Sequence, residues 1–222
     1  MYGVSAGAIA ATYRAAGRKA QKIFERLFEI TVAPSKWLHL SFSSHLLKST
    51  LPKKYFEEDL PHTFEELHIK TYVGATDMYT ANFIVFDQGE IIPPLLGSIA
   101  LPGIFPSVKY QHYLLNDGGI IDNFPTSIAQ RTYPHHQIIG VALNKFKEHQ
   151  EPKNIVETLI LTLEVMMRKD IVKRIKEIAL SFYEDIDCKR LERDKRKRKK
   201  AFDQGYYSGM KALNERDTFE SH

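Results

Sequence analysis

The first residues of the chain hold the pattern that most restricts its fold. Residues 3–7 read Gly-Val-Ser-Ala-Gly, a G-x-S-x-G motif, and an alanine-rich helical pattern follows at once. This pattern is typical of a sharp strand-to-helix turn that holds a serine in a strained backbone conformation. We expect Gly3 and Gly7 to remove Cβ atoms that would collide with the neighbouring strand and helix. Ser5 is therefore the candidate nucleophile, and the Ala6 N–H at the helix N-terminus is the candidate oxyanion donor.

A serine hydroxyl needs a base, and the sequence offers a carboxylate. The spacing of the nine histidines does not indicate a Ser-His-Asp triad. In an α/β-hydrolase, several strands would also precede the turn that carries the serine. Residues 113–125 instead contain an apolar strand that ends in Asp117-Gly118-Gly119. The two glycines let the backbone turn sharply and leave the Asp117 carboxylate at the strand end. Taken alone, this tripeptide is also what an ordinary turn contains.

Four segments of the sequence form a specific set when taken in order. They are residues 3–11 (a serine turn and first helix), 74–86 (A-T-D strand and hairpin), 98–108 (S-x-A-x-P-G-x-F-P, with Ser107 replacing a second proline) and 117–125 (D-G-G block). In this order they resemble the patatin-like phospholipase family, whose members use a Ser-Asp dyad without histidine. The resemblance implies that Ser5 is the nucleophile and Asp117 the general base of a lipid acyl hydrolase. It implies an acyl-enzyme and no metal or organic cofactor, while Asp122 and Asn123 are expected to be structural.

The family begins with a strand and a Gly-rich oxyanion loop before the elbow, and this sequence has neither ahead of Gly3. We therefore expect an N-terminally truncated domain, either a fragment or a shortened homologue that compensates by forming a homo-oligomer or by rearranging its sheet. Because loss of one oxyanion donor costs about 10²–10³ in rate, poor esterase activity is expected. The alternative is a catalytically silent, membrane-associated or scaffold domain.

The length of 222 residues predicts one domain, and the alternation of helical and strand patterns predicts an α/β protein. We expect a three-layer α/β/α patatin-like sandwich with a mostly parallel central sheet, in which residues 1–150 form the catalytic core and 151–222 are helical. Two apolar, proline-containing loops, 93–96 and 101–106, are expected either to cover the core or to line an acyl-chain pocket. The predicted helices are 6–28, 36–49, 124–131, 153–182 and 187–213, and the predicted strands are 69–75, 82–87, 110–116 and 137–142.

The net charge of +4 arises from one segment, 189–200, which holds nine basic and two acidic residues. Three interpretations remain open: a solvated helix face, a contact with an anionic membrane surface, and nucleic-acid binding. The last is not expected, because no recognisable nucleic-acid-binding fold accompanies the charge. The basic residues are Lys189, Arg190, Arg193, Lys195, Arg196, Lys197, Arg198, Lys199 and Lys200.

The remaining composition carries few indications of location. A single cysteine, Cys188, allows no internal disulfide, and Cys/His metal-binding spacing is absent. Residues 4–11 lack the basic region that precedes a signal-peptide core. We expect a cytoplasmic, membrane-peripheral protein if Met1 is the true start of translation.

Overall fold

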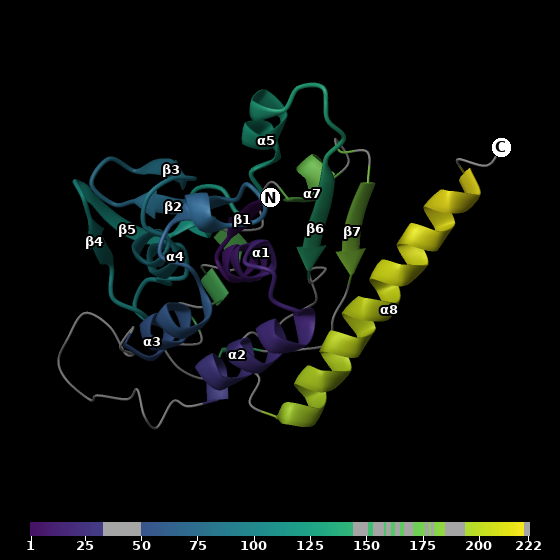
Figure 1. Cartoon of the computed structure of the whole chain (residues 1–222), viewed down its shortest axis with the longest axis horizontal. Helices are drawn as coiled ribbons and strands as arrows, with labels where there is room; N and C mark the ends of the chain where they lie inside the picture. The colour runs from purple at the N-terminus through teal and green to yellow at the C-terminus, as the bar shows by residue number, and fades with distance from the viewer. Residues whose placement is uncertain are drawn as a thin grey trace. The chain divides into compact units, whose positions relative to one another are not determined.

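The computed structural model describes two compact units, Met1–Pro125 and Thr126–His222, which are considered separately. Figure 1 shows the elements of both. The predicted helix 36–49, Cys188 and much of the predicted helix 153–182 lie outside the described residues, and the single-domain organisation stays a prediction. The described residues are 1–32, 50–143, 151–152, 158, 161–162, 165–166, 171–175, 178, 180–184 and 194–219.

The first unit contains a five-stranded sheet with β2 at its centre. β3 runs antiparallel along one edge of β2, while β1 and β5 share the other edge. β1 runs parallel to the first half of β2 and β5 antiparallel to the second half, so the C-terminal ends of β1 and β5 approach each other. The elements are β1 (Tyr2–Val4), α1 (Ala6–Ala15), α2 (Ala20–Val32), α3 (Thr50–Asp59), η2 (Phe64–Glu66), β2 (Tyr72–Asp77), β3 (Asn82–Phe86), α4 (Ile92–Ser98), β4 (Val108–Tyr110), β5 (Tyr113–Asp117) and η3 (Gly118–Ile120).

The α/β class predicted from the sequence is confirmed, and the sheet is mixed. Within it β1–β2 is a parallel pair, whereas β2–β3, β2–β5 and β4–β5 are antiparallel. Short connections account for two of the antiparallel pairs: residues 78–81 join β2 to β3 and residues 111–112 join β4 to β5, and such short links can only produce antiparallel pairs. The expected mostly parallel arrangement therefore does not describe this sheet.

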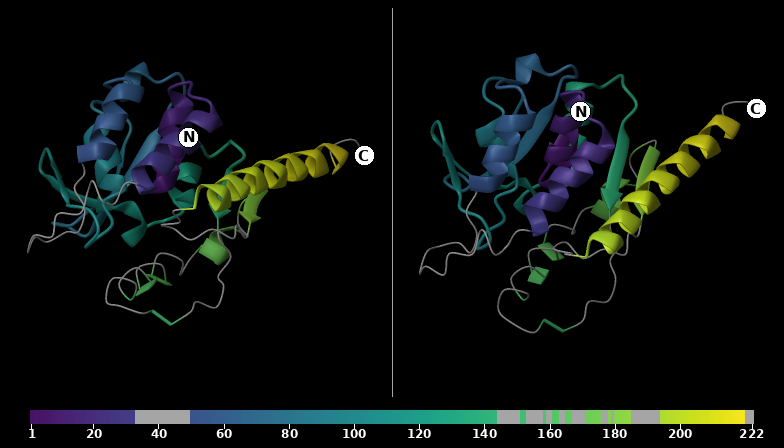
Figure 2. Two further views of the ribbon diagram at one scale, coloured as in Figure 1. Left: turned by 90° about the horizontal axis from the view of Figure 1, so that it is seen from below. Right: turned by 60° about the horizontal axis from the view of Figure 1, so that its bottom comes forward.

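Helices α1 and α4 pack on one face of the sheet and contact each other. Their apolar side chains meet those of β2 in a core that includes Ile9, Tyr13, Val73 and Leu95. Both views in Figure 2 show α2 and α3 side by side, and these two helices also contact each other. The burial of both Val73 and Ala75 on β2 is the pattern of a strand covered by helices.

The predicted helix 6–28 is wrong as a single element. It is divided into α1 and α2 by Gly17, whose φ of 76° is left-handed, the conformation that commonly ends a helix. The Gly17 N–H donates to the Arg14 C=O and the Arg18 N–H donates to the Tyr13 C=O, at 3.0 and 2.9 Å. The sequence signal for the end of α1 was Gly17, which directly follows two alanines.

The predicted loop 93–96 is also wrong, because it lies within α4. Pro93 and Pro94 occupy the first turn of this helix, where a missing N–H costs no hydrogen bond and a fixed φ favours helix formation. Leu95 and Leu96 are buried, so the segment does cover the core.

The second unit contains a two-stranded parallel sheet, β6–β7, and a long C-terminal helix that contacts β7. β7 begins inside the predicted helix 153–182, which is wrong at that point: the alternating Leu180 and Phe182 form a strand that pairs with β6. The last helix is confirmed from Lys195 onward and ends beyond the expected boundary. The elements are α5 (Thr126–Thr132), β6 (Ile139–Leu143), α7 (Ile171–Ile175), β7 (Leu180–Glu184) and α8 (Lys195–Phe219).

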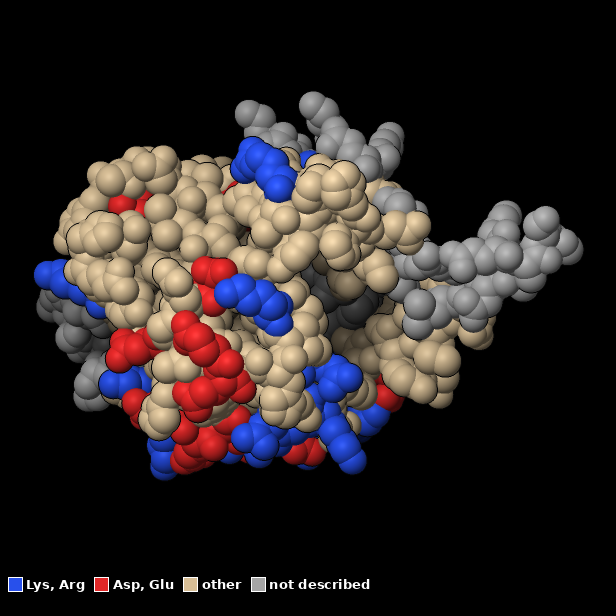
Figure 3. Space-filling view, turned by 45° about the horizontal axis from the view of Figure 1, so that its top comes forward, with Lys and Arg blue, Asp and Glu red and all other residues tan. Residues whose placement is uncertain are grey.

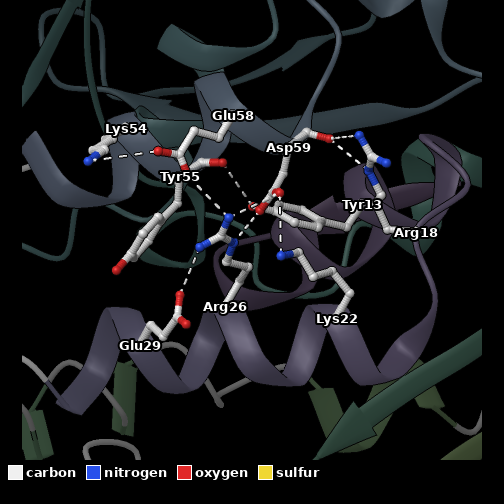
Figure 4. Close-up of polar contacts among 9 residues, drawn as sticks. All are labelled: Tyr13, Arg18, Lys22, Arg26, Glu29, Lys54, Tyr55, Glu58 and Asp59. Atoms are coloured by element: carbon white, nitrogen blue, oxygen red, sulfur yellow. Dashed lines mark hydrogen bonds and ion pairs between the residues drawn. The ribbon is translucent and has the colours of Figure 1, made fainter.

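A partly buried charge network joins α1, α2 and α3 around Asp59 (Figure 4). Arg26 donates to the Asp59 carboxylate, Lys22 lies 3.7 Å from it, and the Tyr13 hydroxyl donates to it at 3.2 Å. Arg18 donates twice to the Asp59 C=O, at 2.8 and 2.6 Å. Burial raises the pKa of Asp59, but the hydrogen bond and charge of Arg26, with Lys22 and Tyr13, outweigh it and hold the pKa below its ordinary value.

We predict that Arg26→Gln lowers the free energy of unfolding by about 3 kcal/mol at neutral pH, since it leaves a buried carboxylate without its main partner. A lowered folded-state pKa contributes stability that is present above the unfolded pKa and lost as pH falls through the folded pKa. The difference between parent and variant should therefore narrow on acidification. Urea unfolding at neutral and acidic pH measures it.

The matched control is Lys53→Gln, which removes an exposed ion pair to Glu57. It should change the free energy of unfolding by less than about 0.5 kcal/mol. An equal effect of both variants would contradict the structural importance of the Asp59 network.

Candidate active site

The end-to-end meeting of β1 and β5 brings Ser5 and Asp117 together. Val4 pairs with Gly74, and Asp117 pairs with Ala75, the next residue of β2. Ser5 directly follows Val4, and its Oγ donates a hydrogen bond of 2.7 Å to Asp117 Oδ2. Two residues separated by 112 positions are thus placed by neighbouring residues of a single strand.

The Asp117 carboxylate is held in one orientation. Its Oδ1 accepts the Gly119 N–H at 2.9 Å, which leaves Oδ2 directed at Ser5. The backbone of Asp117 is held as well. The Asp117 N–H donates to the Ala100 C=O at 3.0 Å, and the Asp117 C=O accepts the Thr76 hydroxyl at 2.9 Å. Asp117 is only 1% exposed. Backbone and side chain are therefore both fixed, as a base acting on one hydroxyl requires.

Gly118 permits the close approach of the two strand ends. A Cβ on Gly118 would lie 2.5 Å from the Gly74 carbonyl oxygen and 2.9 Å from Val4 Cγ1. Val4 lies on β1 and Gly74 on the strand that both β1 and β5 join, so a larger residue would push β5 away from β1. The Asp117-Gly118-Gly119 turn is thus required here by space as well as by backbone freedom.

Ser5 lies on a strained turn between β1 and α1. Its φ of 54° and ψ of −128° are unusual for a residue with a side chain. The Ser5 C=O accepts the Ala8 N–H at 2.9 Å, which starts α1 immediately after the turn. Ser5 is half-buried, while Ala6 and Gly7 in the first helical turn are exposed. The geometry presents the hydroxyl at the N-terminus of a helix, where a negative charge is favoured.

The predicted steric role of the flanking glycines holds for Gly3 and is wrong for Gly7. A Cβ on Gly3 would lie 2.5 Å from Ala8 Cα and 2.6 Å from the Gly7 carbonyl oxygen. A Cβ on Gly7 would meet no described atom within 4 Å, because it would point to solvent from the first turn of α1.

We predict opposite effects for alanine at these two positions. Gly3→Ala should lower the free energy of unfolding by about 2 kcal/mol or more, because the backbone of α1 must move. Gly7→Ala should leave it unchanged or raise it by up to about 1 kcal/mol, because alanine is the better helix former. Thermal unfolding followed by circular dichroism measures the stability of the two variants. An equal loss of stability in Gly3→Ala and Gly7→Ala would disprove the proposed difference.

The structure adds Ser98, whose role the sequence did not reveal. The Ser98 hydroxyl accepts the Ser5 N–H at 2.9 Å and donates to the Gly74 C=O at 2.7 Å. In a parallel ladder with this register, the Ser5 N–H would donate directly to the Gly74 C=O. The hydroxyl of the fully buried Ser98 takes the place of this direct hydrogen bond, at the point where β1 leaves β2 and the chain turns into α1. No local pattern around residue 98 indicates this contact, because it bridges segments that are distant in the sequence.

The other segments of the resemblance support the same strands. The Ala100 C=O accepts both the Asp117 N–H and the Asn116 amide, so the segment after α4 anchors the end of β5. Asp77 accepts from the Thr80 hydroxyl and from the Leu114 N–H. The Thr80 hydrogen bond, with the backbone N–H groups, holds the pKa of the Asp77 carboxyl below its ordinary value. These contacts tie β2, its hairpin and β5 together.

The Asp122 carboxylate has a structural role in the turn that follows Asp117. It accepts the Phe124 N–H at 3.0 Å.

Within the described ranges, no group of His, Cys, Asp and Glu side chains has the arrangement of a metal site. The described helices include none long and apolar enough to cross a bilayer.

Comparison with known proteins places this geometry in a family. A family model described as patatin-like phospholipase matches residues 1–129, which include Ser5, Ser98 and Asp117. Uncharacterized NTE family proteins of Mycobacterium bovis and Mycobacterium tuberculosis are each 33% identical over 54 residues, 24% of this chain and 9% of theirs. The chain thus aligns with less than a tenth of the length of these curated relatives, whereas the family match covers more than half of the chain. The chain therefore belongs to the patatin-like phospholipase family.

Proposed function

We propose that the chain is a lipid acyl hydrolase in which Ser5 is the nucleophile and Asp117 is the general base. The observation that carries the proposal is the hydrogen bond of 2.7 Å from Ser5 Oγ to Asp117 Oδ2. Membership of a phospholipase family indicates a lipid hydrolase. The direct contact between hydroxyl and carboxylate supports a dyad, because a candidate base must reach the proton that it removes.

The proposed reaction has two halves. Ser5 Oγ attacks the ester carbonyl carbon as Asp117 takes the hydroxyl proton, and the oxyanion forms beside the Ala6 N–H at the start of α1. Collapse of this intermediate releases the alcohol, which takes the proton from Asp117 and leaves Ser5 acylated. A water then attacks the acyl-enzyme and gives its proton to Asp117. The second collapse releases the carboxylic acid and returns the proton to Ser5 Oγ.

Ser98 is a positioning residue in this proposal. Because its hydroxyl joins the Ser5 N–H to the Gly74 C=O, it fixes the backbone from which the nucleophile projects. The strained φ of Ser5 persists only if surrounding contacts maintain it, and this buried bridge is one such contact.

We predict that Ser98→Ala lowers kcat by roughly tenfold and the free energy of unfolding by about 1–3 kcal/mol, since a buried N–H and C=O lose their partner. KM should change little, because Ser98 is fully buried. Steady-state hydrolysis and urea unfolding measure the two effects. Ser107→Ala, at an exposed serine of the same segment, is the control. A loss of stability with unchanged kcat would restrict Ser98 to a structural role.

Labelling with a fluorophosphonate probe tests the proposed function. The parent protein should form a covalent adduct, and peptide mass spectrometry should place it on Ser5. The adduct should form far more slowly in Asp117→Asn, because the hydroxyl loses its base. Folded parent protein that stays unlabelled would instead favour a catalytically silent domain.

A further inference from the structure

Helix α8 presents cations and aromatic rings on a single side. Lys195, Arg196, Lys199 and Lys200 recur at helical spacing and are all exposed, with 96% of the Arg196 side chain accessible. On the same side, Tyr206, Tyr207 and Met210 are 61%, 70% and 43% exposed. We name these seven residues the exposed α8 face.

The opposite side of α8 faces its own unit. Gly209 and Ala212 are half-buried on that side, and the helix contacts β7. In Figure 1 α8 runs beside β7, which agrees with that contact. The exposed α8 face therefore points away from the element on which the helix packs.

The cations of this face do not serve the stability of the helix. Residues 195–200 are six consecutive cations in its first two turns, where the helix dipole favours negative charge. Lys195 and Lys199, like Arg196 and Lys200, are like charges four residues apart, which is unfavourable. The Asp194 cap on the Arg196 N–H and the Lys199–Asp203 ion pair offset part of this cost. A negatively charged surface outside the helix would offset more.

We propose that the exposed α8 face binds an anionic lipid surface, with the helix lying along the membrane. Clustered cations are attracted to anionic headgroups, each strengthening binding about fivefold near the surface. Tyrosine has an apolar ring with a polar hydroxyl and suits the headgroup level, and Met210 adds apolar area beside it. On the face drawn in Figure 3, acidic side chains gather with basic side chains beside them.

Co-sedimentation of the whole chain with vesicles tests this proposal. Binding should require phosphatidylserine in phosphatidylcholine vesicles and should weaken as salt rises. The double variant Arg196→Gln and Lys200→Gln should bind about 25-fold more weakly, from two cations at about fivefold each. Glutamine is a good helix former, so the helix content measured by circular dichroism should be unchanged.

Two further variants make the result specific. Tyr206→Ser with Tyr207→Ser should weaken binding while keeping its dependence on salt, because only apolar contact is lost. Lys53→Gln with Lys54→Gln removes as many exposed cations from α3 and should bind like the parent. Ser5→Ala should also bind like the parent, so membrane contact is tested independently of catalysis.

Three results would overturn the proposal. The first is equal binding to phosphatidylcholine vesicles with and without phosphatidylserine. The second is parental binding by the Arg196 and Lys200 double variant. The third is tight binding of a single-stranded oligonucleotide without any binding to vesicles, which would assign the cations to nucleic acid.

Discussion

Replacing Ser5 by alanine is expected to lower hydrolysis of a short-chain p-nitrophenyl ester by about 10³-fold or more. The reason is that Ser5 Oγ both contacts the Asp117 carboxylate and stands at the N-terminus of α1. Alanine keeps the turn and the hydrogen bond from the residue-5 N–H to Ser98, so the fold should persist. Initial rates over a range of ester concentrations, together with circular dichroism, provide the measurement.

Ser107→Ala is the matched control, since it removes an exposed serine hydroxyl from the same unit. Its rate should equal that of the parent. If Ser5→Ala retained parental hydrolysis, the ester would be cleaved elsewhere and the proposed nucleophile would be incorrect.

Asp117→Asn is expected to lower kcat by about 10²–10⁴-fold, the contribution typical of a general base. An asparagine oxygen can still accept the Gly119 N–H that orients the carboxylate. What it cannot do is take the proton from Ser5, so the loss should appear in kcat far more than in KM. Single-turnover formation of the acyl-enzyme measures the affected step directly.

The control for this variant is Asp122→Asn, five residues along the same segment. The Asp122 carboxylate accepts the Phe124 N–H, a contact that an asparagine oxygen can replace. Its kcat should remain near the parental value. Equal losses in the two variants would mean that the loop, and not the base, had been damaged.

The proximity of Ser5 and Asp117 could be predicted because the segments around both residues resemble those of a family that uses a Ser-Asp dyad. Ser98 could not be found in this way, since its importance depends on a rung between β1 and β2 that only the folded sheet defines. Its hydroxyl bridges a strand at the start of the chain and another some 70 residues later, and no local spacing indicates that.

The errors in secondary structure have different causes. The break at Gly17 and the helix whose first turn contains Pro93 were both predictable, because glycine and proline have known positional preferences at helix ends. Strand β7 was not, since a short apolar segment adopts a strand only where a partner such as β6 is available.

β1 and β5 pair with the same edge of β2. The contact between Ser5 and Asp117 therefore depends on how completely the sheet has assembled. β1 and β5 must both dock on β2 in correct register, because a shift of one residue moves a strand end by about 3.3 Å and would separate hydroxyl from carboxylate. During refolding, covalent labelling should therefore recover only after both pairings have formed, later than the helical signal of α1. Labelling of Ser5 would thus report on the docking of both β1 and β5 on β2.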